Sequence, residues 1–268
     1  MGNDIFCDWV TSDLHVPFAP FIQSHPQKYV EKNQIIDLHV YSTRMKKKID
    51  FNALHAVIWD MDGVLVDSEP AHLEAWRITL EKHHLPSYPE RLKRTFGMTS
   101  EMVVQTMIDE PISAEKLSAI LQEKDCVFKE KIMQQAPMPQ GVMSWLSTFK
   151  TNNIRQAVAS SGTPENIQLI LHKLDILSFF DEIVSGKGIP SKPAPNIFLK
   201  AADLLGVIPP NCLVIEDSRA GVQAARAAGM RCVAVTTTSP PEQLDGADIK
   251  VENLSQLMTD QVLGLFSG

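Results

Sequence analysis

The sequence contains no apolar run long enough to cross a bilayer, although 44% of its 268 residues are hydrophobic. A membrane-spanning helix needs about 20 consecutive apolar residues, so no membrane partner is expected. Internal repeats and low-complexity tracts are also missing, which leaves an ordinary globular chain. Its length suits one domain with an insertion, or two modest domains.

Cysteines are few and lie far apart in the chain. The four are Cys7, Cys126, Cys212 and Cys232, and none forms a Cys-x-x-Cys pair. This spacing argues against a disulfide framework or a zinc site and fits a reducing cytoplasm, where we expect the protein to reside. Cys212 and Cys232 fall in apparent strands and are interpreted as small core residues.

Positive charge is in deficit. The chain has 25 Lys and Arg residues against 32 Asp and Glu, a net charge of −7. This balance argues against nucleic acid as a partner. A small phosphorylated metabolite is nevertheless expected as a partner. An acidic protein can bind phosphate, because a bound cation and a lysine make the local electrostatic potential of a site positive.

Residues 1–52 lack helical or strand periodicity. They contain no basic segment followed by an apolar core, so a secretory signal is not expected. Met45-Lys46-Lys47-Lys48-Ile49 is typical of an ordinary bacterial start. We therefore interpret 1–52 as an N-terminal extension, in which residues 1–44 are either disordered or the result of an upstream start assignment.

A regular pattern begins at Ala53. The apolar run predicts a strand over about 54–60, and a helix is predicted near 70–84 with Leu73, Trp76 and Leu80 on one face. Two more helices are predicted at about 100–109 and 113–133. Residues 68–138 are thus predicted to form a small helical insertion joined through loops at about 67–70 and 136–140.

Alternation of strands and helices resumes after Pro137-Met138-Pro139. One helix start is well marked, with Thr163 as N-cap and Pro164 in the first position. The alternation predicts a parallel sheet with right-handed crossovers, and therefore an α/β fold. The predicted strands are 154–159, 182–184, 212–216, 232–235 and 248–251, and the other predicted helices are 141–151, 195–205 and 219–228.

Two acids stand directly after the first strand, in Asp60-Met61-Asp62-Gly63. Side chains of an extended segment alternate, so both carboxylates can point the same way. In open α/β sheets, ligands bind in the crevice beyond the carboxyl ends of the strands. The motif alone is weak, because Asp and Gly are also common in simple turns.

Three further polar segments follow in the chain: Ser160-Ser161-Gly162, Ser191-Lys192-Pro193 and Glu216-Asp217-Ser218. Acids that bind a divalent cation beside Ser and Lys donors make a site for a phosphoryl group. Each segment also has a simpler interpretation. Lys192 could be a surface charge, Ser160 could be a helix N-cap, and the acid pair could be a solvated turn. The coincidence of all the segments favours one site.

Together the residues of Asp60–Ser68, Ser160, Lys192 and Glu216-Asp217 resemble the four ordered motifs of the haloacid dehalogenase (HAD) superfamily. The helical insertion after the first motif is similar to the α-helical cap of its β-phosphoglucomutase and sugar-phosphatase branch. The resemblance implies a Rossmann-like parallel core over 53–67 and 139–268, with an inserted helical cap over 68–138.

The resemblance also implies roles for individual residues. Asp60 would be the nucleophile that becomes an aspartyl phosphate, and Asp62 the general acid and base. Ser160, its neighbour Ser161, and Lys192 would bind the phosphoryl oxygens. Mg²⁺ would be held by Asp60, the backbone carbonyl of Asp62 and Asp217, with Glu216 in support.

The proposed role of Asp62 has an electrostatic requirement. A carboxyl group that is half protonated at pH 7 needs a pKa about three units above its usual value. We expect the dianionic substrate and the nearby carboxylates to raise it.

Two residues of the insertion are candidate substrate contacts. His72 matches a position near the active site of β-phosphoglucomutases, but a surface histidine is equally consistent. Trp76 fits the packing stripe with Leu73 and Leu80, so burial is the favoured interpretation.

The reaction follows from comparison within the superfamily. Asp62 points to phosphate esters, because dehalogenases lack this acid and phosphonatases use a cap lysine instead. Mutases usually carry Gly-x-Ser-Arg in the cap, whereas here Gly97-Met98-Thr99-Ser100 has no arginine. The mutase's cap lysine has no secure match either, since Glu123 and Lys124 both fall near its position.

We therefore predict a monomeric, Mg²⁺-dependent phosphatase that acts on small, sugar-like phosphates. A β-phosphoglucomutase is the second candidate. A receiver-like module, phosphorylated on aspartate to switch a partner, is the non-enzymatic alternative.

Overall fold

The computed structural model describes residues 28–31, 34–37, 49, 51, 53–95, 99–108 and 110–267. The chain divides into two compact units, Met1–Ile49 and Asp50–Gly268. In the first unit, β1 (Lys28–Glu31) pairs antiparallel with β2 (Gln34–Asp37). The sequence did not predict these strands. The hypothesis about residues 1–44 otherwise concerns residues outside the described ranges.

A six-stranded parallel sheet forms the centre of the second unit, in the order β5-β4-β3-β6-β7-β8. The central strand β3 pairs with β4 and β6, and Trp59 is level with Val158 and Ile215. Helices cover both faces of the sheet, so every side chain of β3 is buried, which explains its unbroken apolar sequence. The strands are β3 (Ala56–Trp59), β4 (Arg155–Ser160), β5 (Glu182–Ser185), β6 (Cys212–Glu216), β7 (Arg231–Val235) and β8 (Ile249–Val251).

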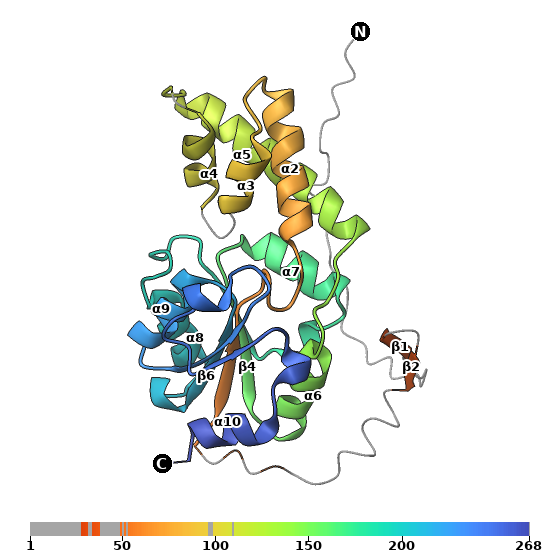
Figure 1. The fold of residues 1–268 in the computed structure, drawn as a ribbon, viewed down its shortest axis with the longest axis vertical. Coiled ribbons are helices and arrows are strands. Elements are labelled where there is room, and N and C mark those ends of the chain that lie inside the picture. Colours follow the sequence, from red (N-terminus) through yellow and green to blue (C-terminus); the bar gives the residue numbers. More distant parts are fainter. Residues whose placement is uncertain are drawn as a thin grey trace, which may run out of the picture. The chain divides into compact units, whose positions relative to one another are not determined.

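Helices cover both faces of this sheet (Figure 1). Helices α6 (Val142–Thr151) and α7 (Pro164–Lys173) lie on one side, and α8 (Asn196–Leu205) and α9 (Arg219–Ala227) on the other. On the α6 side, the Phe149 ring is 6.1 Å from Trp59 and 5.1 Å from Trp145. The predicted α/β, Rossmann-like fold is confirmed. The C-terminal helix α10 (Thr259–Leu265) was not predicted.

The cap domain consists of the helices between β3 and α6. These are α2 (Glu69–Lys82), α3 (Pro89–Arg94), α4 (Ser100–Met107) and α5 (Ala114–Gln134). Trp76 and Leu80 are buried in its core with Leu92, Val103 and Ile120, and Leu73 packs against this cluster. The predicted stripe is therefore confirmed, whereas the short helix α3 was missed.

The cap domain lies over the carboxyl ends of the strands (Figure 1). The two chain segments that connect it to the sheet domain run side by side, because the Asp67 amide donates to the Pro137 carbonyl at 2.9 Å. The cap is thus an insertion that leaves and re-enters the sheet domain at one place.

Within the described ranges, no helix combines the length and the apolar character that a bilayer crossing needs. Cys212 and Cys232 are buried in β6 and β7, as predicted.

Candidate active site

Asp60 follows β3 directly and continues the sheet, since its amide donates to the Ile215 carbonyl at 2.9 Å. A tight turn comes next, in which the Met61 carbonyl accepts from the amides of Leu65 and Val66. Gly63 has a φ of 80°, a left-handed conformation that glycine adopts without strain. The turn keeps the paired acids at the strand end.

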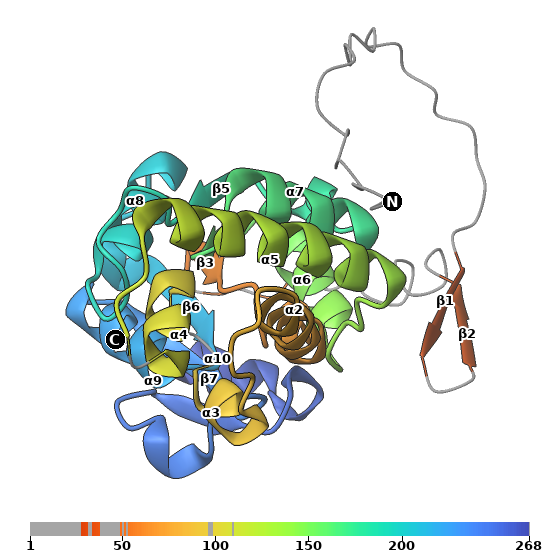
Figure 2. The ribbon, with the colours of Figure 1, turned by 90° about the horizontal axis from the view of Figure 1, so that it is seen from above.

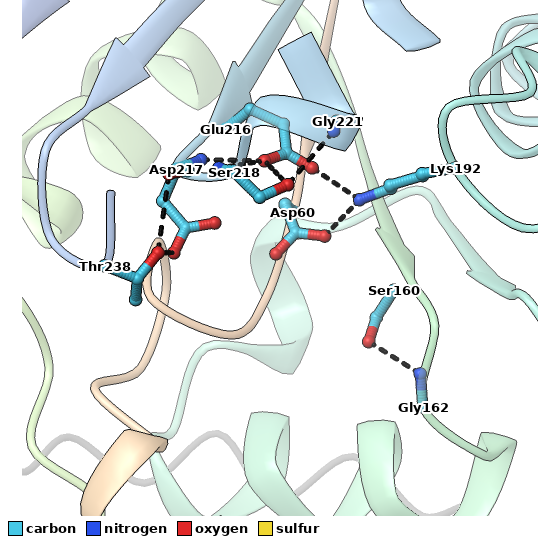
Figure 3. Close-up of polar contacts among 9 residues, drawn as sticks. All are labelled: Asp60, Ser160, Gly162, Lys192, Glu216, Asp217, Ser218, Gly221 and Thr238. Atoms are coloured by element: carbon cyan, nitrogen blue, oxygen red, sulfur yellow. Dashed lines mark hydrogen bonds and ion pairs between the residues drawn. The ribbon is translucent and has the colours of Figure 1, made fainter. Parts of the chain in front are cut away.

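Parallel pairing brings the other predicted residues to the same edge. Ser160 ends β4, Glu216 ends β6, and Asp217 follows it. Lys192 reaches in from the loop between β5 and α8. Asp60 lies between Asp217 on one side and the pair Lys192 and Ser160 on the other (Figure 3).

Lys192 bridges two carboxylates. Its Nζ lies 2.5 Å from Asp60 Oδ1 and 2.6 Å from Glu216 Oε1. Burial alone would lower the pKa of Lys192, but the charges of Asp60 and Glu216 raise it above its usual value. The lysine is therefore a protonated group with only 13% of its side chain exposed, and the surface-charge interpretation is wrong.

Glu216 is fully buried and saturated with hydrogen bonds. Its Oε2 accepts from the Asp217 amide at 2.8 Å, and from the amide and hydroxyl of Ser218 at 2.7 and 2.9 Å. Burial would raise its pKa, but Lys192 and these amides outweigh burial and lower it. Glu216 thus holds Lys192 in place, and the solvated-turn interpretation is wrong.

Asp217 is buried next to Thr238, whose hydroxyl donates to Asp217 Oδ2. Burial raises the pKa of Asp217 well above its usual value, and the charges of Glu216 and Asp60 add to this. A Cβ at Gly63 would overlap the Asp217 carboxylate, so the glycine also allows the close approach. Sequence reasoning missed Thr238, because nothing distinguishes it from Thr236 and Thr237.

Three carboxylates therefore share one lysine. Burial raises the pKa of Asp60 to about 7, Lys192 works against this, and Glu216 and Asp62 add to it. Buried carboxylate oxygens with a surplus of negative charge are the ligands that Mg²⁺ prefers. This charge surplus on Asp60 and Asp217 fits the cation that the sequence implies.

The donor set differs in one respect from a cluster of acidic side chains. Within the described residues, no group of three or more His, Cys, Asp or Glu side chains is arranged to hold a metal. The expected set uses only two side chains, Asp60 and Asp217, together with the backbone carbonyl of Asp62. Glu216 would act on it indirectly, since both of its oxygens already accept hydrogen bonds.

The loop after β4 presents Ser160, which is buried and accepts from the Gly162 amide at 3.0 Å. Ser160 does not cap α7, because Thr163 takes that role by accepting from the Asn166 amide at 3.3 Å. Ser161 is exposed. The predicted N-cap at Thr163 is thus confirmed, and Ser160 lies beside the central acids.

Asp62 faces the cap domain. Its Oδ1 accepts from the Ser68 hydroxyl at 2.5 Å and lies 3.6 Å from His72 Nε2. Burial raises the pKa of Asp62, but His72, Ser68 and Lys124 outweigh burial and lower it. In the protein alone, the pKa of Asp62 is thus lowered and not raised, because Ser68, His72 and Lys124 favour its ionised form. The rise expected from a dianionic substrate stays a prediction.

A buried lysine of the cap completes this side of the site. Lys124 Nζ lies 3.0 Å from His72 Nδ1 and 4.8 Å from the centre of the Phe128 ring. Burial lowers the pKa of Lys124 to about 8, although Asp62 and Asp125 work against this. Trp76 is buried in the cap core, with Lys124 Nζ 5.5 Å from its ring centre.

Of the two positions that fall near the mutase's cap lysine, Lys124 lies next to the site and Glu123 does not. Glu123 pairs with Lys82 on the surface, at 2.7 Å. A signal in the sequence distinguishes the two, because Lys124 stands four residues from both Ile120 and Phe128 on the buried face of α5.

Comparison with known proteins agrees with this geometry. A family model described as haloacid dehalogenase-like hydrolase matches residues 57–235. A phosphorylated carbohydrates phosphatase of Thermotoga maritima is 34% identical over 66% of this chain and 82% of its own. A β-phosphoglucomutase of Bacillus subtilis is 32% identical over 76% of this chain and 92% of its own.

A solved structure has the same fold. The β-phosphoglucomutase of Clostridium difficile superposes with a TM-score of 0.71 and 28% identity, over 80% of this chain and 97% of its own. The likeness thus extends across both the sheet domain and the cap.

Gly221 allows the first prediction. A Cβ there would overlap the Glu216 carboxylate, whereas nothing lies within 4 Å of a Cβ at Gly264. We expect Gly221→Ala to destabilise the fold by about 1–3 kcal/mol through overpacking and to lower activity by displacing Glu216. Gly264→Ala, the matched control in α10, should be neutral or stabilise by up to about 1 kcal/mol. Urea denaturation measures both, and equal effects would contradict the prediction.

The second prediction concerns pH. The pKa of Asp60 is about 7 in the folded chain, against an ordinary value of 3.8. Between pH 3.8 and pH 7, Asp60 is therefore protonated in the folded state and ionised in the unfolded state. Its contribution to stability is present at low pH and is lost as pH rises through 7. The metal-free protein should therefore have a lower free energy of unfolding at pH 7.5 than at pH 5. Asp60→Asn should make this slope shallower, and an unchanged slope would argue against the shifted carboxyl.

Proposed function

Since this chain belongs to the haloacid dehalogenase-like hydrolase family, we propose that it is a magnesium-dependent phosphatase that hydrolyses small phosphate monoesters, with sugar phosphates as the first candidates. Family membership makes it an enzyme that acts on phosphate esters. The observation that carries the finer proposal is the Lys192 bridge between Asp60 and Glu216 at the carboxyl edge of the sheet.

In the first half of the reaction, Asp60 attacks phosphorus. Lys192 binds one Asp60 oxygen, and the other forms the new bond to phosphorus while the bond to the leaving oxygen breaks. Lys192 and Ser160 bind the phosphoryl oxygens, so that the developing charge meets fixed donors. The product of this half is an aspartyl phosphate and an alcohol.

Asp62 moves the proton. It gives a proton to the leaving oxygen and takes one from the water that next attacks the aspartyl phosphate, which releases phosphate and restores Asp60. The protein alone keeps the pKa of Asp62 low. A dianionic phosphate close to the carboxyl raises that pKa, so the acid form arises when substrate is present.

Mg²⁺, held by Asp60, Asp217 and the Asp62 carbonyl, would supply positive charge next to the transferring phosphoryl group. Thr238 fixes one oxygen of Asp217 and leaves the other for the cation. Lys192 and Glu216 keep Asp60 in position meanwhile.

A phosphatase is favoured over a mutase because no arginine stands in Gly97-Met98-Thr99-Ser100. Gly97 and Met98 lie outside the described residues, and Thr99 is the N-cap of α4. The relatives include both a phosphatase and a mutase, so the mutase stays the second candidate. The receiver-like alternative is abandoned, because the family is one of enzymes.

Replacement of the nucleophile tests this proposal. We expect Asp60→Asn to lower the rate of p-nitrophenyl phosphate hydrolysis at least about a thousandfold, because the new bond to phosphorus cannot form. Removal of Mg²⁺ with a chelator should abolish turnover, and added Mg²⁺ should restore it. Asp203→Asn, an exposed position on α8, is the matched control. Full activity of Asp60→Asn would overturn the proposal.

A substrate panel separates the two reactions. With β-glucose 1-phosphate and glucose 1,6-bisphosphate, we expect phosphate release to exceed formation of glucose 6-phosphate, since the sequence Gly97-Met98-Thr99-Ser100 provides no arginine for a second phosphate. Phosphate assay and coupled detection of glucose 6-phosphate measure the ratio. A ratio in favour of glucose 6-phosphate would make the mutase the better assignment.

A further inference from the structure

One side-chain hydrogen bond joins the cap domain to the sheet domain beside the loop after β4. We call this loop, residues 160–163, the phosphate-binding loop, after the role proposed for Ser160. Asn166 Nδ2, in the first turn of α7, donates to Asp125 Oδ1 of the cap helix α5 at 2.6 Å. The two helices lie next to each other in both views (Figures 1 and 2). The bond therefore connects the helical insertion with α7, the helix that follows Ser160 and Ser161.

Asn166 is an unusual residue for its place. Its side chain is 7% exposed, and its Oδ1 finds no hydrogen-bond partner in the part of the chain that the structure describes. A buried, unsatisfied polar atom costs free energy, and an apolar side chain would avoid this cost. The bond to Asp125 is the contact that offsets it.

The backbone of Asn166 is tied to the phosphate-binding loop, since its amide donates to the Thr163 hydroxyl at 3.3 Å. Ser160 lies three residues before Thr163, and the Gly162 amide donates to its hydroxyl at 3.0 Å. A short, hydrogen-bonded segment therefore links Ser160 to Asn166.

Asp125 is tied to the opposite side of the site. It follows Lys124, which contacts His72 at 3.0 Å, and its charge supports the protonated form of Lys124. Its Oδ2 also pairs with Lys129 on α5 at 2.8 Å. One turn of α5 is thus linked to the first turn of α7, through Asp125, and to Asp62, through Lys124 and His72.

We propose that the Asp125–Asn166 hydrogen bond latches the cap domain onto the phosphate-binding loop, so that Asn166 and Asp125 are positioning residues for the reaction. The inference rests on the proposed function, because it assumes that phosphate binds at this loop. The Asp125–Asn166 hydrogen bond positions Lys124 and His72 next to Asp62 only when the phosphate-binding loop holds Asn166 in place.

A double-mutant cycle tests the latch. We expect Asn166→Ala and Asp125→Ala each to lower kcat/KM for a sugar phosphate at least about tenfold, and the double variant to lose no more than either single one. The loss should appear mainly in kcat, because the cap no longer seats the groups around Asp62. Additive losses would overturn the proposal.

Two further variants separate the hydrogen bond from the charge. Asp125→Asn removes the charge but keeps an acceptor for Asn166 Nδ2, and its own amide can donate to the unpartnered Oδ1. We expect its kcat to stay within about threefold of wild type. Lys129→Ala, which removes only the surface ion pair, should also be close to wild type. If Asp125→Asn is as impaired as Asp125→Ala, the charge matters and the latch is wrong.

A binding measurement distinguishes failure of the latch from failure of the proposed function. Calorimetric titration of wild type with inorganic phosphate and Mg²⁺ should show binding, and Asn166→Ala should bind within about threefold of wild type, because the expected loss lies in kcat. Absence of binding to wild type would overturn the proposed function and the latch with it. Equal binding and equal kcat in wild type and Asn166→Ala would overturn the latch alone.

Discussion

The charge balance around Lys192 is the constraint on which the site depends. Asp60, Glu216 and Asp217 are buried at one edge of the sheet, where an uncompensated carboxylate costs several kcal/mol. Lys192 neutralises part of this charge through two short contacts, and its own ammonium is held by Glu216. The remaining negative charge is costly, and a cation together with a dianion would complete the balance.

Sheet geometry makes this concentration of acids possible. Parallel strands end at a common edge, so residues more than 150 positions apart, Asp60 and Glu216, become neighbours through the β3–β6 pairing. Two glycines then let the groups approach. Gly63 leaves room for the Asp217 carboxylate and Gly221 for that of Glu216. Small residues at these points are therefore as necessary to the site as the charged ones.

The sequence predicted the sheet domain well because its signals were local. Apolar runs ended by polar residues marked β3, β4 and β6, and Thr163-Pro164 marked the start of α7. The parts it missed depend on contacts across the fold. Thr238 is identified by its contact with Asp217 and Asn166 by its contact with a helix of the cap domain. The pKa of Asp62 is set by Ser68, His72 and the charge of Lys124. No spacing along the chain encodes these.

The single amide-to-carbonyl bond between Asp67 and Pro137 has a consequence for how this enzyme could change. Both segments that connect the cap domain to the sheet domain meet at this bond, so the cap domain can be replaced in evolution without a change in the sheet. The residues that select the metabolite can then change within α2–α5 while Asp60, Glu216 and Asp217 stay in place.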